Sequence, residues 1–238
     1  MAIHVDIQSG VGVLTLDRPE CAHAYDHEHL TALAAGFERL EGSVAVVVIR
    51  STGDRAFCGG ADLKELAHAD PLSALDLASQ RIFDTIARSS TLTIAAIQGP
   101  AVAGGGELTL ACDLRVVGPG ACLRLPELRH GLIPSAGGCT RLTRLVGPSI
   151  AKQVILFGEE LDATALVRLG LALPGGADPF ARAMQIAAGF LERSDPVAAR
   201  LAKQVIDHDD DSDRLTMERV SESLLYQRRA IASDPSTD

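Results

Sequence analysis

The chain has 238 residues, of which 47% are hydrophobic and 22% are charged, so it is long enough and apolar enough to form a large folded core. Its formal net charge of −9 argues against a nucleic-acid backbone or an anionic membrane as a partner. The five cysteines form no CxxC pair, no apolar run approaches the roughly 20 residues that span a bilayer, and the N-terminus has no signal-peptide pattern, so we expect a cytoplasmic protein with reduced thiols.

Strand and helix patterns alternate through the first half of the chain. Apolar residues alternate around Gly10 and Gly12, which is typical of a two-stranded hairpin, and the later strands are β-branched runs typical of buried strands. The predicted elements, in chain order, are a hairpin over 3–16, a helix over 27–41, a strand over 44–50, a helix over 72–90, a strand over 93–99, a helix over 106–112 and a strand over 114–118. This alternation indicates an α/β fold with largely parallel strands.

Past residue 141 the pattern is entirely helical. Helical spacing covers residues 142–158 and 161–172, and a further helix is predicted over 194–207. Ser194 or Asp195 would cap that last helix, with Pro196 in its first turn. The sequence therefore predicts one α/β core followed by a helical C-terminal segment.

Two glycine-rich loops stand at strand-to-helix junctions, one over 55–65 and one over 103–106, directly before Glu107. Glycine lets backbone N–H groups approach a ligand, and a helix N-terminus adds positive partial charge. The dinucleotide pattern GxGxxG fails at Thr109, and the chain contains no Gly-Lys-Ser/Thr of a P-loop. Close helix–strand packing is the alternative for one such loop. Two of them after adjacent parallel strands can aim two donors ~2.7–3.1 Å from a developing oxyanion.

Three segments carry a family resemblance: AFCGGADLKE (56–65), GPAVAGGGELTLACD (99–113) and LPELRHGLIPSAGGCTRLTRLVG (125–147). They resemble the signature segments of the crotonase (enoyl-CoA hydratase/isomerase) superfamily, in its order and at its spacing. The resemblance extends over residues 3–233. It implies a crotonase-like β/α spiral core over 1–190, a C-terminal helical trimerisation segment over 191–238, and a homotrimer or hexamer.

The same resemblance implies a set of functional residues. The N–H groups of Ala61 and Gly104 would form an oxyanion hole, and Glu107 and Glu127 would be the catalytic carboxylates. The expected contacts with the acyl-CoA thioester are Ala22, Asp62, Leu63, Lys64 and Gly105. The resemblance implies no metal and no cofactor other than the coenzyme A of the substrate.

Two glutamates suit the addition of water to a 2-enoyl thioester, which needs two proton transfers. A carboxyl pKa rises in an apolar pocket, so one glutamate can be an acid while its neighbour stays ionised. We expect syn hydration, with Glu107 activating water and Glu127 donating to the α-carbon, although the two roles could be shared or exchanged. The alternatives are an isomerase, a hydrolase or decarboxylase of the same fold, and a non-catalytic acyl-CoA-binding or scaffold protein.

The chain departs from the family pattern in three places. His23 stands where the family usually has asparagine, in a segment bordering the entrance for CoA and the acyl chain. The stretch after Gly170 is short, which predicts the loss of a strand-like connection. The chain ends in ASDPSTD without the final helix carrying E-x-F-x-x-K/R, so we expect that helix to be missing.

Two groups of polar residues suggest metal ligands but favour other interpretations. The acidic run 207–218 places carboxylates at four ligand positions of an EF-hand loop, but Ser212 stands where the turn requires glycine. We expect a solvated loop that caps the next helix. His27 and His29 are two residues apart and would point to different sides of a helix, so we expect an exposed helix start.

Overall fold

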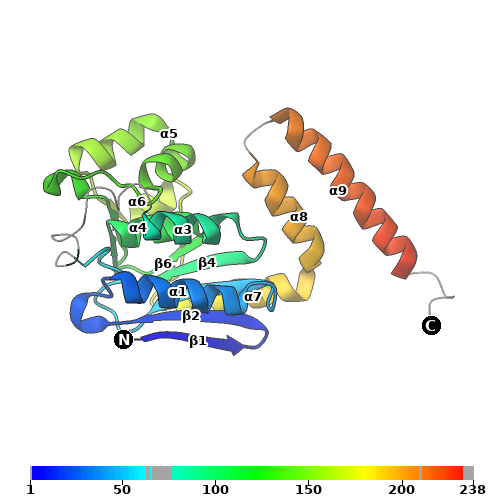
Figure 1. Ribbon diagram of the computed structural model, residues 1–238, viewed down its shortest axis with the longest axis horizontal. Coiled ribbons are helices and arrows are strands. Elements are labelled where there is room, and N and C mark those ends of the chain that lie inside the picture. The colour runs from blue at the N-terminus through cyan, green and yellow to red at the C-terminus, as the bar shows by residue number, and fades with distance from the viewer. Residues whose placement is uncertain (1, 63–64, 66–76, 209–210, 233–238) are drawn as a thin grey trace. The chain divides into compact units, whose positions relative to one another are not determined.

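The computed structural model describes residues 2–62, 65, 77–208 and 211–232. The chain divides into an N-terminal unit, Met1–Ala188, and a C-terminal unit, Gly189–Asp238 (Figure 1). Among the described residues, every helix is too short or too polar to pass through a bilayer.

A six-stranded sheet forms the centre of the N-terminal unit, with strand order β1-β2-β3-β4-β6-β9. Its strands are β1 (Ala2–Gln8), β2 (Val11–Asp17), β3 (Val46–Ser51), β4 (Leu92–Ile97), β6 (Leu114–Val117) and β9 (Leu173–Pro174). The first two strands form the predicted hairpin, and every later neighbour pairs in parallel. The expectation of a largely parallel α/β fold is confirmed.

A second sheet of three short strands has the order β5-β7-β8, over Pro100–Val102, Cys122–Arg124 and Leu161–Asp162. The sequence does not predict this sheet, because two or three residues are too few to show a strand period. The all-helical prediction past residue 141 is wrong at β8 and β9. The predicted loss of a connection after Gly170 is also wrong, because β9 pairs in parallel with β6 through Val116 and Val117.

Helices pack along the sheet and against one another. The helices of the N-terminal unit, with the one that continues past its end, are α1 (His27–Leu40), α3 (Ala78–Arg88), α4 (Gly104–Ala111), α5 (Gly138–Phe157), α6 (Ala163–Arg168) and α7 (Pro179–Arg193). Helix α1 packs on β1 and β2, α3 contacts both α1 and α4, and α4 contacts α5 (Figure 1). Fully buried phenylalanines at 37, 57 and 83 fill the space between these elements. The core therefore surrounds α4, which carries Glu107.

The segment before α1 differs from its prediction. Asp26 caps the helix by accepting from the N–H of His29, and its Oδ1 also lies 2.6 Å from His29 Nδ1. His27 is exposed, but His29 is buried. The expected exposed helix start is wrong for His29, because the Asp26 carboxylate gives its ring a polar partner inside the protein.

The C-terminal unit is helical, with α8 over Pro196–Asp207 and α9 over Asp211–Ala232. Asp195 caps α8 by accepting from the N–H groups of Val197 and Ala198, and its other oxygen lies 2.6 Å from the Arg228 guanidinium on α9. The expected solvated loop over 207–218 is wrong from residue 211 onward, where the chain is helical, and residues 209–210 lie outside the described residues. Among the described residues, no group of three carboxylate, histidine or cysteine side chains could hold a metal ion.

Candidate active site

The two glycine loops meet beside β5. The N–H groups of Phe57 and Cys58 donate to Pro100 O at 2.9 and 3.3 Å, and Val102 N–H donates to Cys58 O at 2.8 Å. A Cβ on Gly60, whose φ is +89°, would lie 3.0 Å from Gly104 N. A Cβ on Gly105 would collide with Cys58 O. The glycines are therefore required because two stretches of backbone lie in direct contact here.

Each of the two loops carries a backbone N–H group near this junction, at Ala61 and at Gly104. Tyr25 pairs in parallel with Ala61, because its N–H donates to Gly60 O and its carbonyl accepts from Asp62 N–H, both at 2.8 Å. In a parallel pair the N–H of the facing residue points away from its partner, so the Ala61 N–H points away from Tyr25. Gly104 is the first residue of α4, where N–H groups have no intrahelical acceptor. Within the described residues, no hydrogen bond takes up either N–H.

Ala103, the residue before α4, has a strained backbone with φ 50° and ψ −127°. A positive φ is uncommon for a residue with a Cβ, and strain of this kind is often kept at functional sites. Its N–H donates to Arg124 O at 2.9 Å, and its carbonyl accepts from Glu107 N–H at 3.0 Å. These bonds hold the turn that directs Gly104 toward the first loop.

Glu107 lies in the first turn of α4 and is only 4% exposed. Its Oε1 accepts a hydrogen bond of 2.8 Å from Gly138 N–H, at the start of α5. The pKa of this carboxyl is raised from 4.5 to about 7, mainly by burial and to a smaller extent by the charge of Glu127, while the Gly138 bond opposes both effects. Glu107 therefore titrates near neutral pH.

Glu127 begins the short 3-10 helix Glu127–His130, directly after Pro126. Both of its carboxylate oxygens are buried and have no hydrogen-bond partner from another described residue. Burial raises the pKa of this carboxyl above its ordinary value of 4.5. The site thus holds one carboxylate anchored by a backbone N–H and a second whose oxygens are available to a ligand.

The other predicted contact residues have mixed outcomes. Asp62 lies 3.4 Å from the Arg18 guanidinium, and Gly105 is buried against Cys58. Leu63 and Lys64 lie outside the described residues, so the structure does not place them. Ala22 lines a pocket beside the first glycine loop, where its carbonyl accepts from Gly59 N–H at 2.8 Å.

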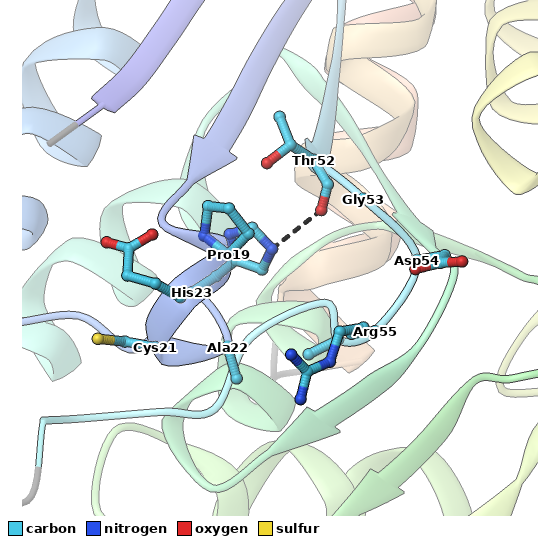
Figure 2. A pocket seen from close by; sticks show the side chains of 10 residues that line it. Pro19, Cys21, Ala22, His23, Thr52, Gly53, Asp54 and Arg55 are labelled. Carbon is cyan, nitrogen blue, oxygen red and sulfur yellow. Dashed lines mark hydrogen bonds between the residues drawn. The ribbon is translucent and has the colours of Figure 1, made fainter.

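That pocket has a volume of about 270 Å³ and lies between segments 19–23 and 52–56 (Figure 2). His23 joins its two walls, because Nδ1 accepts from Arg18 N–H and Nε2 lies 3.0 Å from Thr52 O, the contact dashed in Figure 2. Burial lowers the pKa of His23, so the neutral ring with hydrogen on Nε2 satisfies both contacts. Ala22, with φ 52°, and Arg55 also line the pocket.

Tyr25 is a site residue that the sequence does not predict. Its hydroxyl occupies the place that a side chain at Gly104 would fill. Its ring stands edge-on to Phe83, with centroids 5.9 Å apart. One tyrosine just before a predicted helix gives no periodic signal, so only the three-dimensional structure shows this contact.

Comparisons with known proteins identify the family of this chain. The family model described as "Enoyl-CoA hydratase/isomerase" matches residues 6–232. The chain is 37% identical to "Probable enoyl-CoA hydratase 2, mitochondrial" of Arabidopsis thaliana, over 95% of this chain and 76% of that protein. It is 33% identical to "Methylglutaconyl-CoA hydratase, mitochondrial" of Mus musculus, over 92% of this chain and 72% of that protein.

Solved structures show the same fold. The crystal structure of an enoyl-CoA hydratase from Bacillus anthracis superposes with a TM-score of 0.87 at 32% identity, covering 93% of this chain and 89% of that one. An enoyl-CoA hydratase subunit from Geobacillus kaustophilus superposes with a TM-score of 0.88 at 30% identity, covering 98% and 94%. The crotonase fold with C-terminal helices, expected from the sequence, is confirmed. The chain belongs to the enoyl-CoA hydratase/isomerase family.

Proposed function

We propose that this protein is an enoyl-CoA hydratase that adds water syn across the double bond of a trans-2-enoyl-CoA. The observation that carries the proposal is the pair of buried carboxylates in unlike surroundings, next to two backbone N–H groups without partners among the described residues. The hydratases among its relatives support the same reaction class.

In this proposal, the N–H groups of Ala61 and Gly104 bind the thioester oxygen. As water attacks the β-carbon, charge moves onto that oxygen, and both donors strengthen their hydrogen bonds to it. The N-terminus of α4 adds positive partial charge at the same place. This arrangement favours the enolate over the ground state, which is the requirement for faster reaction.

The two carboxylates then move protons. Glu107, whose pKa is about 7, accepts a proton from water during attack on the β-carbon. Glu127, whose pKa is also raised, donates a proton to the α-carbon. Transfer of one proton from Glu107 back to Glu127 then restores the starting protonation state of both carboxyls. The Glu127 oxygens have no hydrogen-bond partner among the residues that the structure describes, so in this proposal they hold the water as well.

The coenzyme A part of the substrate is assigned to the pocket lined by Ala22 and Arg55. A guanidinium at its edge suits the phosphate groups of CoA. Contacts through Asp62, Leu63, Lys64 and Gly105 belong to the same proposal and rest on the family resemblance.

The test is a spectrophotometric assay of crotonyl-CoA and a longer trans-2-enoyl-CoA, following loss of the conjugated enoyl absorbance. Glu107→Gln and Glu127→Gln are each expected to lower kcat by at least about 10²-fold, the scale of a lost general acid or base. Glu192→Gln, an exposed glutamate on α7, is the matched control and should retain parental kcat.

Near-parental hydration by Glu127→Gln on every accepted substrate would contradict the assignment of Glu127. Binding of the thioester without any hydration by the parent enzyme would instead favour an isomerase or an acyl-CoA hydrolase of the same fold, to be distinguished by product analysis.

A further inference from the structure

Tyr25 contacts both loops that supply the proposed oxyanion-hole donors. Its main chain bonds to Gly60 and Asp62 on either side of Ala61, at 2.8 Å each. Its hydroxyl packs on Gly104, where a Cβ would lie 2.7 Å from Tyr25 Cζ and would collide with the hydroxyl. One residue therefore holds the first donor through its backbone and touches the second donor's residue through its side chain.

Two neighbours on α3 fix the Tyr25 ring. Phe83 on α3 stands edge-on to it at an interplanar angle of 89°. The hydroxyl is hydrogen-bonded to Ser79, a buried residue on the same helix. A phenol has two side-chain torsions, so a packed edge and a hydrogen bond at the tip leave it little freedom. The ring is a rigid spacer between the two loops.

We propose that Tyr25 is a positioning residue that sets the separation between the Ala61 and Gly104 N–H groups. This inference rests on the proposed function, because it concerns the donors assigned there to the thioester oxygen. Donors must lie within a few tenths of an ångström of the developing oxyanion to stabilise it, so a spacer between them acts on the transition state more than on the bound substrate.

The chemistry of the phenol agrees with a spacer that stays neutral. Burial, with the nearby Cys58, Glu107 and Glu127, raises the pKa of Tyr25 far above its ordinary value of 10. The hydroxyl therefore keeps its proton throughout the working pH range, and no proton transfer through Tyr25 is required.

The deciding variant is Tyr25→Phe, which keeps the ring against Phe83 and removes the hydroxyl that touches Gly104 and Ser79. We expect kcat on crotonyl-CoA to fall about tenfold with KM within twofold of the parent, less than the ~10²–10³-fold loss when a donor itself is removed. The enolate of acetoacetyl-CoA absorbs in the near ultraviolet, so binding of this thioester measures how well the oxyanion hole stabilises an enolate without any turnover. Its bound enolate fraction should fall in the same variant.

Matched controls separate positioning from folding. Tyr226→Phe changes the chain's only other tyrosine, which is 61% exposed on α9, and should match the parent in both assays. Ser79→Ala removes the hydroxyl's hydrogen-bond partner and should shift kcat and enolate fraction in the same direction by a smaller factor. Thermal melting verifies that each variant is folded at the assay temperature.

The possible outcomes distinguish a failure of the Tyr25 inference from a failure of the proposed hydratase function. If the parent hydrates crotonyl-CoA and stabilises the enolate while Tyr25→Phe matches it within twofold in both assays, Tyr25 is not a positioning residue and the proposed function stands. If the parent neither hydrates crotonyl-CoA nor stabilises the enolate, the assignment of the oxyanion hole is wrong, and the inference about Tyr25 is wrong as well.

Discussion

Glu107 costs the folded protein stability whenever it is charged. Its carboxyl has a pKa of about 7 in the folded state against 4.5 ordinarily, so between these values the folded state holds more protons than the unfolded state. The contribution of protonated Glu107 to the free energy of unfolding is fully present below about pH 4.5, and it is lost as the pH rises through about 7. The difference corresponds to about 3 kcal/mol at alkaline pH.

Glu107→Gln should therefore be more stable than the parent at pH 8 and close to it at pH 5. The uncharged amide fills the same space without a buried charge. Thermal melting at both pH values measures the difference in stability. At pH 8 the melting temperature of the variant is expected to exceed that of the parent by about 5–10 °C for a chain of this length. Equal differences from the parent at the two pH values would show that the carboxyl is not perturbed in the folded state.

At the scale of single residues, the sequence predicts those functional residues that lie in a recognisable motif. Glu107 and Glu127 follow glycine or proline in segments that carry a strong resemblance. His23 departs from the family pattern, but its position between Arg18 and Thr52 depends on two loops that meet only in the fold. Tyr25 gives no pattern at all, because its partners lie in loops and helices distant along the chain.

Helix α4 is short, apolar and buried on all sides, so its ends need internal partners. The Arg115 guanidinium on β6 supplies them at the C-terminal end, donating to Thr109 O at 3.1 Å and Cys112 O at 2.7 Å. It also donates to Leu171 O at 2.6 Å, which connects the segment before β9 to the same point. One cation thus complements a helix C-terminus and joins three segments.

Arg115→Met should destabilise the protein strongly, because the carbonyls of Thr109, Cys112 and Leu171 each lose a hydrogen bond from a buried charged donor. At roughly 1.5–3 kcal/mol for each hydrogen bond to a charged group, we expect the free energy of unfolding to fall by about 3 kcal/mol or more, measured by urea unfolding. Arg88→Met is the control, since that side chain is 79% exposed and its ion pair with Asp84 contributes little. Equal midpoints for the two variants would contradict the role of Arg115.

Long elements with a clear period are predicted well from the sequence, and short ones are not. The hairpin, α1 and strands β3, β4 and β6 lie within a few residues of their expected bounds. Strands β5, β7, β8 and β9 exist because neighbouring backbone groups pair in space, as at Ala101 and Leu123. No local preference in two or three residues could reveal them.

At the scale of the whole molecule, the C-terminal unit presents apolar side chains on its helices. Among the side chains of this unit that the structure describes, the large apolar ones more than a third exposed are Val197, Ile206, Val220, Leu224 and Tyr226. We propose that they lie in the contacts between protomers of the homotrimer or hexamer that the resemblance implies, because a contiguous apolar surface is typical of a contact with another chain.

Light scattering at assay concentration should therefore give a mass that is a multiple of three protomers. Ile206→Glu, on an exposed part of α8, should lower that mass, whereas Glu222→Gln on α9 should leave it unchanged. A monomer at assay concentration would reject the trimer and leave the proposed chemistry within one chain.

The Tyr25 ring has a further use that follows from composition. The chain contains no tryptophan and two tyrosines, so its intrinsic fluorescence comes from one phenol at the site and one on α9. In the Tyr226→Phe background, all tyrosine emission would originate beside Gly104. Ligand entry would then change a built-in optical signal, and binding rates could be followed by stopped flow with no attached dye.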